Sequence, residues 1–217
     1  MGDIIEKIQT EKIIAIVRNV DKDKLIKLCQ ALYDGGIRII ECTYDATGKT
    51  SDAETAEKIK MIIDEFGEKM ITGAGTVLNE NQVELTKKAG GKFIISPDTN
   101  VDVIKKTKEE GLISIPGALT PSEITLATRA GADFVKLFPV NAVGGISYLK
   151  AVSAPLSNVK FLAVGGVNVE NISDFLKGGF SGVGIGNGIV NTKMLENDDY
   201  EGITNLAKEF IKNSKED

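Results

Sequence analysis

The chain repeats one local pattern along almost its whole length: a short β-branched run, a polar amphipathic stretch, and then a glycine before the next run. Eight such runs occur, and most are continuously apolar rather than alternating. Continuous apolarity is typical of parallel strands that are covered on both faces. The eight runs are residues 13–17, 37–40, 70–74, 92–95, 112–115, 133–138, 160–164 and 182–185.

The stretches between the runs carry helical spacing and helix-end signals. Leu25 and Leu28 fall on one face after Asp21, which we expect to be an N-cap. Thr120 and Pro121 open another stretch, where proline suits the first helical turn. Glycine follows nearly every stretch, and it takes the left-handed conformation of a helix end without steric strain. These glycines are Gly35, Gly36, Gly67, Gly90, Gly91, Gly111, Gly131, Gly178 and Gly179.

Eight strands, each followed by a helix and with no break in composition, predict a single (β/α)8 TIM barrel domain over residues 1–217. We expect a short leading helix at 4–9 to cover the bottom of the barrel, and 200–212 to form the last helix. A doubly wound open sheet is the competing architecture. Against it, the first run leads into Val17-Arg18-Asn19 without a glycine fingerprint, and eight runs suit closure.

The composition excludes several function classes. The 217 residues contain no histidine, which removes imidazole bases, Ser-His and Cys-His nucleophile systems, and histidine-ligated zinc. A net charge of −5 weighs against a nucleic-acid partner, and it means that local features must hold any anionic ligand.

The two cysteines, Cys29 and Cys42, are too few for a disulfide framework and fit a reducing compartment. No apolar run approaches the roughly 20 residues needed to span a bilayer, and the N-terminal residues do not read as a secretory signal. We therefore expect a cytoplasmic protein with no membrane segment.

In a barrel, functional side chains gather where the strands end. The polar residues predicted at those ends are few, and two glycine-rich segments follow the last two runs. The side chains are Arg18, Glu41, Thr43, Thr76, Ser96 and Lys136.

Lys136 is the most informative of these residues. It lies between Val135 and Leu137 in an apolar run, so its ammonium has no solvated face and must point into the barrel mouth. Burial lowers the pKa of an amine, which is the property that a Schiff-base lysine requires. The alternative is a lysine paired with a carboxylate for stability alone, although buried pairs are weak stabilisers.

Glu41 is the expected companion of Lys136. Strand alternation puts it on one face with Ile39 and Thr43, and if that face is the inner one, its carboxylate reaches the mouth. There it can move protons while the amine forms and breaks a carbinolamine and an imine. The alternative is a simple ion pair that holds the barrel together.

Arg18 ends the first run and is the one arginine of three predicted at the mouth. Its guanidinium can hold a carboxylate by a two-pronged contact, and the alternative is a surface salt bridge. After the seventh and eighth runs come Gly165-Gly166 and 184–188, whose backbone N–H groups can approach an anion. Tight turns also require glycine, so this signal is weaker.

Together these residues resemble the 2-keto-3-deoxy-6-phosphogluconate / 4-hydroxy-2-oxoglutarate aldolase family over about residues 12–190. The matching segments, in order, are 14–18 (IAIVR), 40–43 (IECT), 73–78 (GAGTVL), 95–97 (ISP), 115–123 (IPGALTPSE), 135–139 (VKLFP) and 163–167 (AVGGV).

The resemblance implies a class I, Schiff-base aldolase that needs no metal or cofactor and is commonly a homotrimer. It implies that Lys136 condenses with the substrate ketone and that Glu41 moves protons. It also implies a binding role for other mouth residues: Arg18 with Thr76 on the α-carboxylate, Pro97 and Phe138 as walls, and the backbone at Gly165, Gly166, Gly186 and Asn187 on a distal phosphate. Thr43 completes the expected binding set.

Three positions depart from the family pattern. Asp45 stands where some members carry an arginine, so the carboxylate grip rests on Arg18. Val164 stands where the phosphogluconate enzymes often have threonine and the phosphogalactonate enzymes valine, which leaves the C4 configuration open. Asn187 replaces the usual serine at the phosphate corner.

Three functions stay open at this point. The first is a lyase that splits a 2-keto-3-deoxy-6-phosphosugar acid into pyruvate and glyceraldehyde 3-phosphate, with 4-hydroxy-2-oxoglutarate as a further substrate. The second is a phosphosugar isomerase or epimerase with Glu41 as base, and the third is a non-catalytic phosphosugar-binding subunit. Fold alone does not choose among them.

Overall fold

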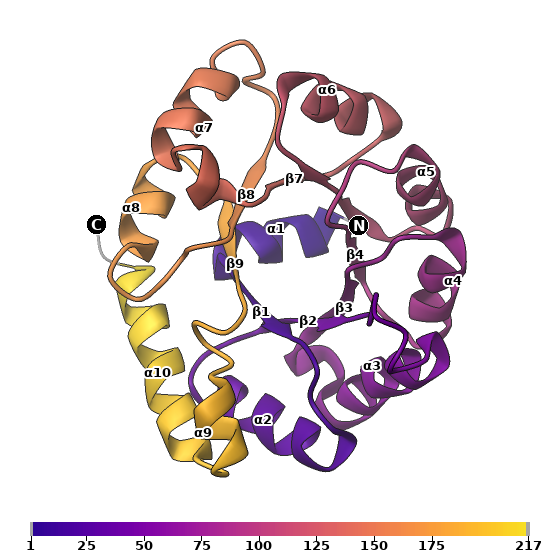
Figure 1. Ribbon diagram of the computed structural model, residues 1–217, viewed down its shortest axis with the longest axis vertical. Coiled ribbons are helices and arrows are strands. Elements are labelled where there is room, and N and C mark those ends of the chain that lie inside the picture. Colours follow the sequence, from indigo (N-terminus) through magenta and orange to yellow (C-terminus); the bar gives the residue numbers. More distant parts are fainter. Residues whose placement is uncertain (1, 216–217) are drawn as a thin grey trace.

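Parallel strands in the order β5-β4-β3-β2-β1-β9-β8-β7-β6 form the sheet of this protein, and helices surround it (Figure 1). The computed structural model describes residues 2–215. The strands are β1 (Ile13–Val17), β2 (Ile39–Thr43), β3 (Ile71–Gly75), β4 (Phe93–Ile95), β5 (Ile113–Ile115), β6 (Gly117–Ala118), β7 (Val135–Leu137), β8 (Phe161–Val164) and β9 (Gly182–Ile185).

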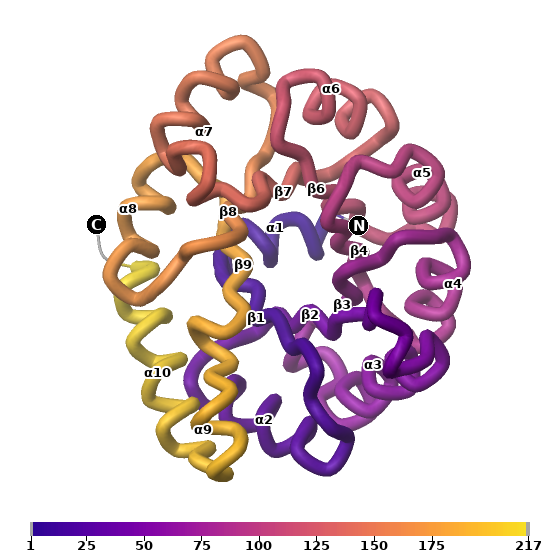
Figure 2. The backbone as a smooth tube through the Cα atoms, in the orientation of Figure 1, coloured from indigo at the N-terminus to yellow at the C-terminus, as the bar shows by residue number. Residues whose placement is uncertain are grey.

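The sheet closes into a ring through Pro116. The two ends of the strand order, β5 and β6, lie on either side of Pro116, whose nitrogen has no hydrogen to donate to a ladder. β5 matches the predicted run 112–115, and β6 extends the same strand beyond that prediction. β5 pairs with β4, β6 pairs with β7, and the Lys136 N–H donates to the Pro116 carbonyl at 2.9 Å. The tube in Figure 2 follows this ring. The predicted (β/α)8 barrel is therefore confirmed, with its fifth strand in two pieces.

The helices follow the strands as the repeat predicted. They are α1 (Gly2–Glu11), α2 (Lys22–Asp34), α3 (Asp52–Phe66), α4 (Glu80–Lys88), α5 (Val101–Glu109), α6 (Pro121–Ala130), α7 (Ile146–Ser153), α8 (Ile172–Lys177), α9 (Thr192–Glu196) and α10 (Tyr200–Asn213), with 3-10 turns η1 (Gly67–Lys69) and η2 (Val140–Val143). Among residues 2–215, none of these helices is both long and apolar enough to cross a membrane.

Local capping explains where several helices begin. Thr120 and Glu123 form a reciprocal capping box at the start of α6, and Pro121 occupies its first turn. Asp21 is the N-cap residue of α2, as predicted, but its side chain makes no capping hydrogen bond. Gly131 ends α6 at φ 107°, a left-handed conformation in which a β-carbon is strained.

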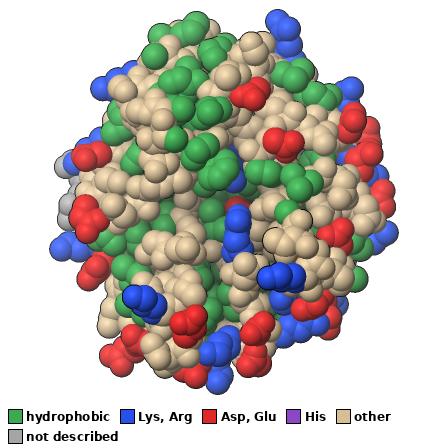
Figure 3. Space-filling model, viewed as in Figure 1, with side chains coloured by type: hydrophobic (Ala, Val, Ile, Leu, Met, Phe, Trp, Pro, Cys, Tyr) green, Lys and Arg blue, Asp and Glu red, His purple; other side chains and the backbone are tan. Residues whose placement is uncertain are grey.

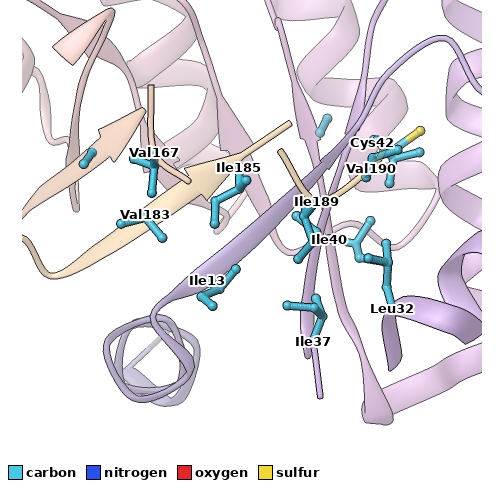
Figure 4. Close-up of a cluster of buried hydrophobic side chains, with 14 of the residues drawn as sticks. Ile13, Leu32, Ile37, Ile40, Cys42, Val167, Val183, Ile185, Ile189 and Val190 are labelled. Atoms are coloured by element: carbon cyan, nitrogen blue, oxygen red, sulfur yellow. The ribbon is translucent and has the colours of Figure 1, made fainter. Parts of the chain in front are cut away.

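The buried apolar residues form two clusters, one inside the barrel and one in the layer between the strands and the helices. Inside, Ile14, Ile39 and Phe93 share a cluster with Ile8 of α1, and Ile8 is almost completely buried. Figure 1 shows α1 lying across one end of the barrel, so the predicted leading helix does close the bottom. The outer cluster contains the alternate strand residues, among them Ile13, Ile40, Cys42 and Val183. Figure 4 shows part of this cluster, with Ile40 near Leu32 of α2.

Candidate active site

Strand alternation extends the inner face of the barrel upward from its apolar bottom to a polar mouth. On β2, Ile39 lies in the inner cluster, and Glu41 follows two residues later on the same face. Phe134, directly before β7, lies in the inner cluster, and Lys136 on β7 follows two residues later on the same face. Figure 3 shows a hollow in the middle of the molecular surface in view, with basic and acidic atoms inside it and apolar side chains around it.

Lys136 is 6% exposed, and its strand neighbours Val135 and Leu137 lie in the outer apolar cluster. The Lys136 Nζ lies 4.6 Å from the centre of the Phe138 ring, a cation–π distance that orients the amine. Among the described residues, no salt bridge joins this amine to a carboxylate. A purely structural ion pair therefore does not explain why the lysine is buried.

Glu41 is 2% exposed, and Thr43 donates a hydrogen bond from its hydroxyl to Glu41 Oε1 at 3.3 Å. The second oxygen, Oε2, is buried and has no hydrogen-bond partner among the described residues. A buried acceptor without a partner is unfavourable for stability, and such groups are typical of functional sites. This oxygen is free to exchange a proton with a bound molecule.

The electrostatics of the pair follow from burial and from two neighbouring charges. Burial lowers the pKa of Lys136, the Glu41 carboxylate works against that shift, and Arg18 adds to it. Burial raises the pKa of Glu41, while Lys136, Arg18 and the Thr43 hydroxyl bond each oppose the increase. The neutral amine and the protonated carboxyl are thus both favoured relative to the same groups in water.

Arg18 follows β1 directly, is exposed, and donates from Nη2 to Thr76 Oγ1 at 3.3 Å. Thr76 follows β3 and has φ 52°, an uncommon conformation for a β-branched residue. Asp45, which departs from the family pattern, accepts hydrogen bonds from Thr47 and Thr50 in its own loop. These bonds lower the Asp45 pKa to about 2, and they stabilise the loop in which Asp45 lies.

The remaining predicted mouth residues lie in two places, after β4 and β7 and in the turns after β8 and β9. Pro97, half-buried, and Phe138, 37% exposed, follow β4 and β7 on the inner face, because Ile95 and Phe134 before them lie in the inner cluster. The same alternation turns Ser96 away from the mouth, so this candidate does not join the site.

The predicted anion-binding glycines gather at one corner. β8 and β9 are paired, which brings Gly165 and Gly166 beside Gly186 and Asn187. Gly165 and Gly166 have φ values of 100° and 79°, a region where side chains are strained. A β-carbon at Gly166 would lie 2.6 Å from the Asn141 side chain, so this turn requires glycine for space as well.

The sequence motifs included the segment 73–78, but they indicated neither a role for Gly75 nor the closure of the barrel at Pro116. Gly75 shares the inner face of β3 with Gly73, and an inward glycine on a strand is the sequence signal of a close approach by another group. That signal does not name the approaching group, which is the Glu41 carboxyl.

A barrel with a desolvated amine and a buried carboxyl at its mouth suits an aldolase, a lyase of the aldehyde-lyase type, and the relatives of this chain belong to that class. A family model described as KDPG and KHG aldolase matches residues 4–206. The chain belongs to the KDPG and KHG aldolase family, as the sequence motifs predicted.

Relatives and solved structures agree with this assignment. The KHG/KDPG aldolase of Escherichia coli strain K12 is 34% identical over 207 residues, covering 95% of this chain and 93% of the relative. The 2-dehydro-3-deoxy-6-phosphogalactonate aldolase of the same strain is 33% identical over 175 residues, covering 80% and 82%. A KDPG aldolase structure from Legionella pneumophila, with pyruvate captured as a covalent carbinolamine intermediate, superposes with a TM-score of 0.82 at 29% identity, covering 91% and 92%.

Proposed function

We propose that this enzyme cleaves a 2-keto-3-deoxy-6-phosphosugar acid, of the phosphogluconate or phosphogalactonate type, to pyruvate and glyceraldehyde 3-phosphate. We propose 4-hydroxy-2-oxoglutarate, which gives pyruvate and glyoxylate, as a further substrate. The observation that carries the proposal is the burial of the Lys136 amine at the mouth, where the Glu41 carboxyl acts on it electrostatically, because burial favours the neutral, nucleophilic form of an amine.

The first half of the reaction forms an imine. The neutral Lys136 amine attacks the C2 carbonyl carbon, and the protonated Glu41 carboxyl supplies the proton with which the carbinolamine oxygen leaves as water. Arg18 and Thr76 hold the α-carboxylate through charge-assisted hydrogen bonds, with Thr43 keeping the Glu41 carboxyl in place. Pro97 and Phe138 exclude water from the side of the imine.

The second half breaks the carbon–carbon bond. The Glu41 carboxylate takes the proton of the C4 hydroxyl, the C3–C4 electron pair moves into the protonated imine, and the aldehyde leaves. The resulting enamine takes a proton at C3 from the Glu41 carboxyl. Water then hydrolyses the protonated imine to pyruvate and the neutral Lys136 amine, and the proton released returns to the Glu41 carboxylate. The backbone at Gly165, Gly166, Gly186 and Asn187 holds the distal phosphate against the unfavourable field of a chain with net charge −5.

Trapping with pyruvate and borohydride tests this chemistry. We expect one reduced pyruvyl adduct, located on Lys136 by peptide mass mapping. Lys136→Arg retains the positive charge but cannot form the imine, so it should give no adduct. Lys92→Ala, an exposed lysine that precedes β4, should be modified like the wild type. No adduct in the wild type would reject the lyase mechanism and favour an isomerase or epimerase.

Substrate choice and assembly need separate measurements. Turnover of the two C4-epimeric phosphorylated acids and of unphosphorylated 4-hydroxy-2-oxoglutarate, measured side by side, decides which substrate is preferred. We also propose that the enzyme is a cytoplasmic homotrimer, as in the family. Light scattering coupled to size exclusion should give three times the chain mass of 23.2 kDa, and a monomer mass would contradict it.

A further inference from the structure

Gly75 ends β3, and the Glu41 carboxyl occupies the volume where any other residue at 75 would place its side chain. A β-carbon built on Gly75 would lie 1.5 Å from Glu41 Oε1, 2.1 Å from Cδ and 2.5 Å from Cγ. These are the three nearest atoms, and all belong to Glu41. A methyl group at 75 and the present position of the carboxyl therefore exclude one another.

The backbone around Gly75 cannot easily withdraw. Thr43 is its register partner on β2, and the Tyr44 N–H donates to the Gly75 carbonyl at 2.8 Å. The residue after Gly75, Thr76, accepts the hydrogen bond from Arg18 at the end of β3. Since both strands are held, a side chain at 75 would displace the Glu41 side chain rather than the strands.

The glycine is not needed for its backbone freedom. Gly75 lies within a paired strand and is not among the glycines with positive φ. Any residue can adopt such a conformation, so the requirement at this position is for space.

We propose that Gly75 is a positioning residue for Glu41: its missing side chain is the space that holds the carboxyl at the mouth. The inference rests on the proposed function, in which Glu41 moves protons at the reacting carbon atoms. Displacement of the carboxyl would move Oε2, the buried oxygen without a partner, away from the imine.

Gly75→Ala, Glu41→Ala and the double variant form the test. We expect Gly75→Ala to lower kcat about 10- to 100-fold, because a misplacement of about 1 Å is enough for such a loss. The KM should stay near the wild-type value, since Arg18 is untouched. In the Glu41→Ala background, Gly75→Ala should change neither kcat nor Tm further, because the atoms that the methyl meets are gone. An equal loss in both backgrounds, or no loss in the wild-type background, would overturn the proposal.

Gly73→Ala is the matched control on the same strand and face. Its β-carbon would meet the Phe93 ring and the Phe93 backbone carbonyl oxygen, each at 2.5 Å, instead of Glu41, so it should lower Tm to the same extent whichever residue occupies position 41. If Gly75→Ala alone does not fold, the double variant decides: folding with the Tm of Glu41→Ala supports the proposal, and failure to fold overturns it. The Tm cycle requires no activity, so its outcome is distinct from the pyruvate trapping that tests the proposed function.

Discussion

Arg18 Nη2 donates a hydrogen bond to Thr76 Oγ1 at 3.3 Å, and the two residues follow strands β1 and β3, which are not neighbours in the sheet. Strand β2, which carries Glu41, lies between them. The guanidinium therefore crosses the mouth next to both members of the buried pair, and it lowers the pKa of each. The same group is suited to hold a substrate carboxylate and to favour the neutral form of the amine.

Glu41→Gln and Arg18→Gln should move the pKa of Lys136 in opposite directions. The Glu41 carboxylate raises this pKa, so its removal should lower it further, whereas Arg18 lowers it, so its removal should raise it. Titration of 13C-labelled lysine by NMR measures both shifts, with the signal assigned by its absence in Lys136→Arg. The Arg18 effect should weaken with added salt, because the guanidinium is exposed. Shifts in the same direction would contradict this electrostatic account.

Glu41→Gln should also fold normally and turn over roughly 10²–10⁴-fold more slowly, the usual loss when a general acid–base is removed. The amide is isosteric and can still accept the Thr43 hydrogen bond, so the effect should appear in kcat rather than in Tm. Steady-state kinetics and thermal unfolding measure the two quantities. Turnover close to wild type would remove Glu41 from the mechanism.

Arg18→Ala should raise the KM for the keto acid about 10- to 100-fold, because a hydrogen bond to a charged group contributes about 1.5–3 kcal/mol. Arg18→Lys should recover only part of the loss, since an ammonium cannot form the two-pronged contact. Initial rates over a range of substrate concentrations separate KM from kcat. An unchanged KM in Arg18→Ala would place the carboxylate elsewhere in the mouth.

Ile8→Ala should reduce the free energy of unfolding by about 2–4 kcal/mol, the usual effect of removing a buried isoleucine side chain. Ile8 is 1% exposed and packs into the inner cluster at the bottom of the barrel, away from the mouth residues. Its kcat should therefore stay at the wild-type value. Chemical denaturation measures the change, and Gln9→Ala, at an exposed position on the same helix, should be within about 0.5 kcal/mol of wild type.

Sequence reasoning located most of the strands within one or two residues because continuous apolar runs are local signals. The first and last strands agree at both ends, while β2 begins and ends later than predicted, at Ile39 and Thr43. The part of β2 that was not predicted includes Glu41 and Thr43, whose polar side chains depart from the apolar pattern of a buried strand. The short helix α9 was not predicted, and its five residues are too few to show helical spacing.

Sequence alone determined the repeating strand and helix units, the burial of Lys136 and the face on which Glu41 lies, because alternation and apolar continuity act between near neighbours in the chain. The family resemblance placed Arg18 and Thr76 at one site, and the structure shows the hydrogen bond that joins them. Only the tertiary structure decided that the ring closes through Pro116 and that Glu41 fills the space at Gly75. These relationships join residues that are far apart along the chain, and they exist only once strand pairing has brought separate strand ends to one mouth.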